Sequence, residues 1–414
     1  MTELSSAYRG LRRFAPQDDS GLTFVMRLKV AVRILAYFGL AWGTLIMLAT
    51  GLFPGSGLVA LAVAAYFTAP LIAFIRWRGW PFYPNATFRL FIVRPFWYAQ
   101  LLLPLVAAGG LLGLIGGLPF GHSINAGRIA ASVVFVAVAA ILLAGYVGSR
   151  RLVIREVDVA VPGLPDAFDG LRIAQLSDLH IGPHTPRRFL ARVLETTHRM
   201  SPDVIAVTGD LIDDRAEDVA AYARALGELD APLGVFLIPG NHDVYAGWDD
   251  VEHALRASDV GTVLVNHVAL VSKDGETLAL VGTGDPAGGR RGTSRAAPDI
   301  DGTMARVPSD TTVIALAHNP ALWPALAKHG VALTLSGHTH WGQFAVPHLD
   351  WSLASPFLDF AMGAHIERDS ALYISPGTGY WGIPFRLGAS PEVTLVTLRR
   401  GDAATARVHP ARAA

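Results

Sequence analysis

Five short motifs in the second half of this 414-residue chain combine aspartate, asparagine and histidine. They are SDLH at 177–180, TGD at 208–210, GNHD at 240–243, AHNP at 317–320 and SGHTH at 336–340. Carboxylate, imidazole and amide donors bind divalent transition ions, and a majority of histidine favours Mn, Fe, Zn or Co over Ca or Mg. The chain has no cysteine, which excludes a thiolate metal site, a disulfide framework and a cysteine nucleophile.

The motifs hold more candidate ligands than one ion uses, since a single ion takes about four to six. Two ions that share a carboxylate would use the whole set, and a pair roughly 3.5–4 Å apart is the arrangement that binds a transferring phosphoryl group. The charge of two divalent ions exceeds that of the two carboxylates and a hydroxide, so the site would attract an anion. The candidate ligands are Asp178, His180, Asp210, Asn241, His318, His338 and His340.

Each motif alone has a simpler explanation, because Asp and Asn after a strand usually cap a turn. Five motifs in this order make the metal site the better interpretation. The nine other histidines fit no motif and are expected on the surface or in packing, but His184, six positions after Asp178, is expected within reach of a substrate. Arg290 and Arg291 lie on an expected loop, which either contacts a phosphorylated substrate or is simply solvated.

Short apolar runs precede the motifs and predict the strands that position them. In α/β sheets the carboxyl ends of neighbouring strands open into one crevice, so residues far apart in sequence meet there. Strands are expected at 171–177, 204–208, 235–238, 312–317 and 332–336, with helices near 187–200, 217–229 and 321–328. Further β runs at 278–282, 372–375 and 393–398 predict a second sheet. The expected fold is an α/β domain of two packed mixed sheets flanked by helices.

The ordered set DLH, GD, GNHD, H, GHTH resembles the calcineurin-like metallophosphoesterase family over about residues 170–400. The stretch YISPGTGYWGIPFRLG at 373–388 is similar to a membrane-associated bacterial branch, which includes enzymes that cleave the pyrophosphate of UDP-2,3-diacylglucosamine. The resemblance implies a hydrolase that binds two divalent ions, with Mn the preferred metal. It would act on a phosphoester or pyrophosphate bond by attack of a metal-bound hydroxide.

The resemblance also implies a role for each position. Asp178, His180 and His340 would hold the first ion, and Asp210 would bridge the two. Asn241, His318 and His338 would hold the second ion. His242 would be the catalytic histidine, which stabilises the phosphoryl oxygens or protonates the leaving group, and Asp243 would orient it.

The first part of the chain differs in composition from the motif-bearing part. Residues 1–155 carry 14 Lys and Arg against 3 Asp and Glu, whereas the whole chain balances 34 against 34. Apolar runs at about 34–53, 57–75, 99–118 and 129–148 contain no charged residue. Each is long enough, at roughly 1.5 Å per residue, to cross a hydrocarbon core of roughly 30 Å. We therefore expect a membrane domain with a four-helix transmembrane bundle at 1–155 and a phosphoesterase domain at 156–414.

The charged residues that flank the apolar runs predict the orientation. Twelve Lys and Arg, not counting Arg33 at the edge of the first run, lie before the first run, between the second and third, or after the fourth, against Arg128 alone in the other connections. Because Lys and Arg remain on the cytoplasmic side, both termini and the phosphoesterase domain are expected in the cytoplasm, on a multi-pass protein of the inner (plasma) membrane. Gly109, Gly113 and Gly117 predict a helix-packing seam within the bundle.

The combined expectation is a membrane-anchored phosphohydrolase with a lipid-linked substrate, either a phospholipid or a molecule like UDP-2,3-diacylglucosamine. One alternative is a phosphodiesterase for soluble substrates such as cyclic nucleotides. The other is a non-catalytic membrane sensor or scaffold that binds metal. Nucleic acid is not an expected partner, because the acidic second part repels a polyanion. The apolar segment 344–366 either enters the cytoplasmic leaflet or covers the second sheet.

Overall fold

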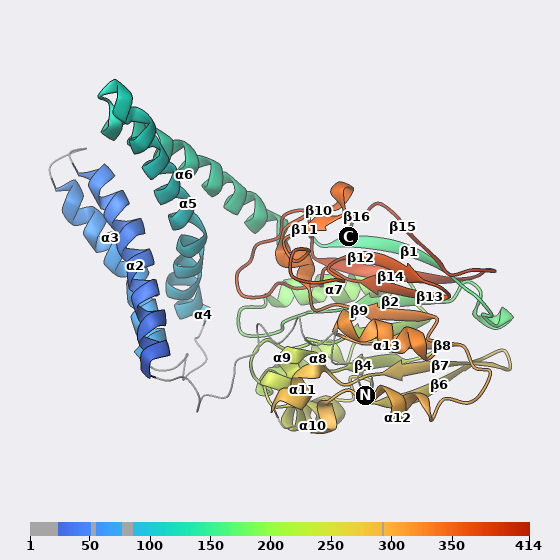
Figure 1. Cartoon of the computed structure of the whole chain (residues 1–414). Helices are drawn as coiled ribbons and strands as arrows, with labels where there is room; N and C mark the ends of the chain where they lie inside the picture. The colour runs from blue at the N-terminus through green and yellow to red at the C-terminus, as the bar shows by residue number, and fades with distance from the viewer. Residues whose placement is uncertain (1–23, 51–54, 77–85, 292–293) are drawn as a thin grey trace. The chain divides into compact units, whose positions relative to one another are not determined.

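The computed structural model describes residues 24–50, 55–76, 86–291 and 294–414. Internal contacts divide the chain into two units, one of residues 1–79 with 95–139 and one of residues 80–94 with 140–414 (Figure 1). The division at residue 155 that the sequence suggested remains a prediction.

The first unit is helical. Its helices are α2 (Phe24–Ala49), α3 (Ser56–Arg76), most of α5 (Arg94–Gly117) and α6 (Ser123–Gly148) as far as residue 139. Two stretches are long and apolar enough to cross a membrane, Arg89–Phe120 and Ser123–Gly148. In α2 and α3 the described apolar stretches are shorter, Ala36–Ala49 and Ser56–Thr68. The described residues thus contain two candidate membrane helices, and the four-helix transmembrane bundle is not confirmed.

Small residues pack α5 against α6. A Cβ atom on Gly113 would lie 2.7 Å from the Cβ of Ala130 and 2.9 Å from the Cα of Gly127, so only glycine allows this approach. Side chains that face away from such contacts are apolar and exposed, among them Leu112 and Val136. The glycines therefore form a seam within this helix pair, as the sequence predicted.

The second unit contains two mixed sheets (Figure 1). The first has the order β15-β1-β14-β2-β3-β4-β5, with β16 also paired to β1, and the second has the order β12-β13-β9-β8-β7-β6. The first-sheet strands are β1 (Val153–Val161), β2 (Arg172–Leu176), β3 (Val204–Thr208), β4 (Val235–Ile238), β5 (Thr262–Val263), β14 (Glu392–Arg400), β15 (Thr405–Val408) and β16 (Arg412–Ala413). Those of the second are β6 (His267–Lys273), β7 (Glu276–Gly282), β8 (Val313–Leu316), β9 (Leu333–Ser336), β12 (Gly363–Glu367) and β13 (Ser370–Ile374).

Three apolar layers hold these elements together. Residues such as Ile173, Phe236, Leu316 and Tyr373 fill the space between the two sheets. The outer face of the first sheet packs on α7 (Arg187–Arg199), α8 (Glu217–Leu226) and α10 (Trp248–Ala257). The outer face of the second sheet packs on α12 (Ile300–Met304) and α13 (Trp323–Lys328). Strands buried on both faces explain why the predicted runs were continuously apolar rather than alternating.

The strands divide between the sheets differently from the sequence expectation. The run 393–398, expected in the second sheet, lies in β14 of the first sheet, parallel to β1 and antiparallel to β2. The runs 312–317 and 332–336 form β8 and β9 of the second sheet, beside β7 and β13. Pairing partners are set by long-range contacts, which local hydropathy does not encode.

Two connecting segments have more structure than the sequence analysis expected. The stretch expected as a loop around Arg290 begins with a short helix, α11 (Pro286–Arg291). In the segment 344–366, Phe360 and Met362 pack with Trp323 against the second sheet, whereas Leu353 and Phe357 are exposed. Part of this segment therefore covers the sheet, and part presents apolar surface. Within it β10 (Ala345–Val346) pairs with β11 (Trp351–Ser352).

Candidate metal centre

The seven candidate ligands all follow the carboxyl ends of strands, as the sequence predicted. Asp178 and His180 follow β2, Asp210 follows β3, and α9 (Asn241–Tyr245) begins shortly after β4. His318 follows β8, and His338 and His340 follow β9. Because β2, β3 and β4 are parallel, as are β8 and β9, both sheets direct their ligand-bearing loops to one edge.

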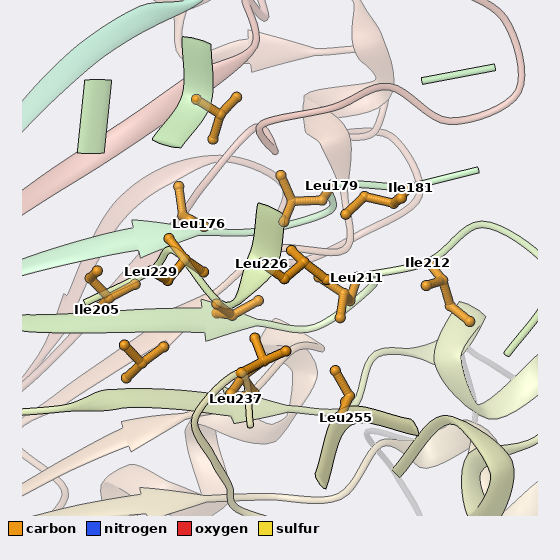
Figure 2. Close-up of a cluster of buried hydrophobic side chains, with 14 of the residues drawn as sticks. Leu176, Leu179, Ile181, Ile205, Leu211, Ile212, Leu226, Leu229, Leu237 and Leu255 are labelled. Atoms are coloured by element: carbon orange, nitrogen blue, oxygen red, sulfur yellow. The ribbon is translucent and has the colours of Figure 1, made fainter. Parts of the chain in front are cut away.

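Apolar residues that alternate with the ligands anchor these loops. Leu179 and Ile181 flank His180 in sequence, and Leu211 and Ile212 follow Asp210. All four apolar side chains are buried in the core beneath the first sheet (Figure 2). The backbone continues the β2–β3 pairing through the loops, with His180 N–H donating to the Asp210 carbonyl at 3.1 Å.

One cluster of donor atoms contains Asp178, His180 and His340. The Nε2 atoms of His180 and His340 lie 3.0 Å apart, and His340 Nε2 lies 3.3 Å from Asp178 Oδ1. Asp178 is fully buried and its carboxylate accepts from Ser177 Oγ at 2.6 Å. Two imidazole nitrogens and a carboxylate oxygen converging in this way form a suitable set for a divalent ion.

A second cluster lies beside the first. His318 Nε2 is 3.2 Å from Asn241 Oδ1 and 3.3 Å from Asp210 Oδ2. His338 Nδ1 is 2.7 Å from the same Asn241 oxygen. Asp210 Oδ2 is also 3.7 Å from His180 Nε2, so this carboxylate lies between the two clusters. Its position is the one that a bridging ligand would need.

The backbone at this edge is strained. Five of the seven candidates adopt positive φ, a conformation that is unfavourable for residues with a side chain and that clusters at functional sites. They are Asp178, His180, Asp210, His338 and His340. Two glycines allow the loops to meet, because a Cβ on Gly240 would collide with Asp210, and one on Gly337 would collide with Asp178.

The protonation preferences agree in part with metal binding. Burial and the charge of Arg386 hold the pKa of His340 well below its ordinary value, and burial with the charge of His318 lowers the pKa of His338 to about 3. Both rings are therefore neutral, as ligation requires. Burial lowers the pKa of His318, but Asp210 outweighs it and raises the pKa well above the ordinary value. An ion would have to displace a proton from His318.

His242 lies at the same edge, and a backbone carbonyl fixes its ring. The ring Nδ1 is 2.7 Å from the Asp213 carbonyl oxygen, which only accepts, so Nδ1 carries the proton. Its centroid lies 4.8 Å from that of His180. The carboxylate of Asp243 accepts instead from the N–H groups of Gly240, Leu211 and Ile212. Asp243 thus holds the loop that carries Asp210, and among the described residues its carboxylate bonds to backbone N–H groups rather than to the His242 ring.

Several residues at this edge were not singled out by sequence reasoning. Asp213 Oδ1 lies 3.4 Å from His180 Nδ1, and Asp213 Oδ2 lies 3.2 Å from a guanidinium nitrogen of Arg89. Arg89 belongs to the short helical segment of residues 86–93 and also bonds to Asp214 at 2.9 Å. Only the extra Asp in the GDLIDD stretch could have indicated this pairing.

Of the residues expected to contact a substrate, His184 is nearly buried and Arg290 is exposed. The His184 side chain is 6% exposed and its Nδ1 lies 3.2 Å from Arg89 Nη1, at the first cluster. Burial lowers the pKa of His184 to about 4. Arg290 is exposed, and its charge contributes to lowering the pKa of His338. The side chain of Arg291 lies outside the described residues.

The part of the chain that carries this site is similar to known proteins. A family model described as calcineurin-like phosphoesterase matches residues 171–342. The chain is 31% identical over 254 residues to a transmembrane protein with metallophosphoesterase domain of Danio rerio. The match covers 59% of this chain and 57% of that protein. It is also 32% identical over 254 residues to an uncharacterized metallophosphoesterase of Helicobacter pylori. That match covers 61% of this chain and 65% of the relative.

A third relative is matched over most of its length. An uncharacterized metallophosphoesterase of Bacillus subtilis is 31% identical over 240 residues, covering 57% of this chain and 82% of the relative. By contrast, the match spans little more than half of the Danio rerio protein. The ligand motifs, their convergence and these matches agree, and the chain belongs to the calcineurin-like phosphoesterase family of metal-dependent phosphoesterases.

Proposed function

We propose that this protein is a membrane-anchored phosphohydrolase that uses two divalent metal ions to hydrolyse a phosphoester or pyrophosphate bond. The observation that carries the proposal is the position of Asp210, whose Oδ2 lies 3.3 Å from His318 Nε2 and 3.7 Å from His180 Nε2. A buried carboxylate shared by two imidazole-rich clusters suits a pair of ions better than one.

The donor set fits such ions, with Mn the first choice and Fe, Zn or Co also compatible. Asp178, His180 and His340 would hold one ion, Asn241, His318 and His338 the other, and Asp210 both. When bound, the ions would supply positive charge at the phosphoryl oxygens and lower the pKa of water.

The protein's own side chains would bind and orient the phosphoryl group. With its Nδ1 proton donated to the Asp213 carbonyl, the His242 ring keeps Nε2 for the substrate. A protonated ring would donate from Nε2 to the leaving oxygen. Asp243 would preserve this arrangement indirectly, because it bonds to the backbone on both sides of the site.

We further propose that the first part of the chain crosses the inner (plasma) membrane four times, with both termini and the phosphoesterase domain in the cytoplasm. Support comes from the two long apolar helices, their exposed apolar side chains and the transmembrane name of the Danio rerio relative. A site tethered at the bilayer is most useful for a lipid-linked phosphate, so a phospholipid or a UDP-2,3-diacylglucosamine-like molecule is the proposed substrate class.

A paired substrate panel tests the proposal. Full-length protein in detergent with Mn²⁺ would be given lipid phosphates, nucleotides and a soluble chromogenic diester, with Asp210→Asn as the inactive control. We expect lipid substrates to have kcat/KM values at least about tenfold above those of soluble substrates. A preference for a cyclic nucleotide would favour the soluble alternative. Equal rates for the wild type and Asp210→Asn on every substrate would favour a non-catalytic sensor.

A further inference from the structure

A pocket of about 340 Å³ opens beside the first metal cluster, within the second unit. His180 and His184 form part of its wall, so a molecule in the pocket can extend to the metal centre. Pockets of this size accept small molecules or the head of a larger one. The remaining lining is Arg94, Ser149, Arg150, Leu179, Thr185, Pro186, Arg188, Phe189, Arg192, Gly379, Tyr380 and Pro384.

The lining is strongly cationic. It contains four arginines and no Asp or Glu. Arg188 and Arg192 stand four positions apart and therefore on one face of α7, opposite Leu190, Val193 and Leu194, which are buried. Among the described residues, Arg94, Arg150 and Arg188 form no ion pair with an Asp or Glu side chain, and Arg192 contacts an oxygen of the last residue, Ala414. Unneutralised guanidinium groups gathered at one pocket favour an anion that offers several oxygens.

The polar contacts of Arg94 and Arg150 are with neutral hydroxyl groups and leave their charge uncompensated. Arg94 donates to the Tyr380 hydroxyl at 2.9 Å, and Arg150 donates to the Tyr146 hydroxyl. Arg192 donates to the Ala414 backbone oxygen at 3.0 Å. The arginines are thus held around the pocket mostly by neutral groups.

The wall also contains apolar side chains, Leu179, Pro186, Phe189 and Pro384, together with the Tyr380 ring. An inorganic anion alone would gain nothing from such surface. An amphiphile would place its charged group against the arginines and an apolar portion against these side chains.

The sequence positions of two lining residues add a second reason. Arg94 lies five positions after the start of the apolar helical stretch Arg89–Phe120, and Arg150 follows the end of α6 by two positions. Both helices belong to the stretches that are long and apolar enough to cross a membrane. A membrane-crossing helix ends near the headgroups, so these arginines stand where anionic headgroups would be.

We propose that this pocket binds a second anionic group and the adjoining apolar portion of an amphiphilic substrate whose scissile phosphoryl group lies at the metal centre. The inference rests on the proposed hydrolase function for the role of the metals, but the pocket itself is defined by Arg94, Arg150, Arg188 and Arg192. A lipid with two linked phosphoryl groups has the required chemistry.

The test uses non-hydrolysable probes with full-length, Mn²⁺-loaded protein in non-ionic detergent. Octyl methylenebisphosphonate carries two anionic groups and an alkyl chain. Methyl methylenebisphosphonate lacks the long chain, and octyl methylphosphonate lacks the second anionic group. We expect the octyl bisphosphonate to bind at least about tenfold more tightly than either of the others by calorimetry.

Variants of exposed arginines assign the effect to the pocket. Arg188→Gln with Arg192→Gln should weaken binding of the octyl bisphosphonate by roughly 10–100-fold, because the two lost charge-assisted contacts together contribute on that order. Binding of octyl methylphosphonate should change by less than about threefold. Arg199→Gln, on the same helix but outside the pocket, is the matched control and should leave all three affinities unchanged.

The outcomes separate this inference from the proposed function. Unchanged octyl bisphosphonate binding in the double variant would overturn the pocket assignment, as would an equal loss in Arg199→Gln. Equal affinity of the methyl and octyl bisphosphonates would overturn the inference that the pocket binds the apolar portion of the substrate. Turnover of a soluble chromogenic diester, measured on the same preparations, reports on the metal centre alone. If it is absent from the wild type while the binding pattern holds, the hydrolase proposal fails and the pocket stands.

Discussion

Arg386 Nη2 donates to Nδ1 of His340 at 2.7 Å, which links a buried cation to a candidate metal ligand. The same guanidinium donates to the carbonyl oxygens of His340, Pro376 and Gly379. It therefore ties the loop after β9 to the loop after β13. Burial lowers the pKa of Arg386 to about 10, which still leaves it charged at neutral pH. The guanidinium fixes the His340 ring with Nδ1 as the acceptor, which opposes a positive charge on the ring and places the proton of the neutral imidazole on Nε2. An ion bound at Nε2 would have to displace that proton.

Replacing Arg386 should weaken metal binding. Arg386→Gln removes the charge and most of the hydrogen bonds, and residues that orient a metal ligand typically contribute 10–100-fold to affinity. We expect a loss of about that size in Mn²⁺ affinity, measured by titration with a competing chelator, together with a lower Tm. Arg386→Lys keeps the charge without the planar fork and should restore only part of the affinity. Wild-type affinity in Arg386→Gln would show that the contact has no such role.

Gly240→Ala should inactivate the site by displacing a carboxylate. The φ of Gly240 is −106°, which any residue can adopt, so backbone strain is not the cause. The added Cβ would instead collide with the backbone nitrogen and Oδ1 of Asp210. We expect diester hydrolysis to fall by at least about 100-fold. Gly289→Ala meets no atom closer than 3.9 Å and should retain activity, and an active Gly240→Ala would argue against a bridging Asp210.

His242→Ala should separate catalysis from metal binding. The ring is not one of the seven proposed ligands, but it lies beside His180 and its Nδ1 is held by the Asp213 carbonyl. General acid catalysis contributes about 10²–10⁴-fold, so kcat should fall within that range. Bound Mn²⁺ per chain, measured by mass spectrometry, should stay at the wild-type value. Loss of metal in step with loss of rate would instead make His242 a ligand.

Asp285 should make the stability of the metal-free protein depend on pH. Burial raises the pKa of this carboxyl to about 6, and its Oδ2 has no hydrogen-bond partner among the described residues. The unfolded chain releases the proton near pH 3.9, so between about pH 4 and 6 the folded state binds more protons and stability falls as pH rises. The full loss is on the order of 3 kcal/mol.

Asp285→Asn should remove that loss, because the amide oxygen can still accept from the Ala287 N–H as Oδ1 does at 2.8 Å. In chelator-treated protein, the variant should melt at a higher temperature than the wild type at pH 7 and at a similar temperature at pH 4. Thermal unfolding in detergent across this range provides the measurement. Parallel curves for the two proteins would mean that the Asp285 carboxyl is not perturbed by burial.

The parts of the fold and site that local sequence encodes were predictable. Runs of buried apolar residues gave β3 and β4 their observed bounds, Val204–Thr208 and Val235–Ile238. The ligand motifs follow such strands, and parallel strands direct their ends to one edge, so the convergence of Asp178, Asp210 and His318 followed.

Features that depend on distant pairing were not predictable. Asp213 and its partner Arg89 are 124 positions apart, and Arg386 and His340 are joined across two loops. The insertion of β14 between β1 and β2 likewise has no local signature. Asp178 and His338 have positive φ, which the sequence does not indicate, because Asp and His adopt this conformation only occasionally and most often have negative φ.

Phosphoester hydrolysis by this protein should require two metal ions bound by the Asp, Asn and His cluster. The most direct measurement titrates chelator-treated, full-length protein with Mn²⁺ and determines bound ions per chain and the rate of chromogenic diester hydrolysis on the same samples. We predict negligible rate without metal, a rise that reaches its maximum at two ions per chain, and loss of both the second ion and the rate in Asp210→Asn. Full activity in metal-free protein, or in Asp210→Asn, would contradict the account.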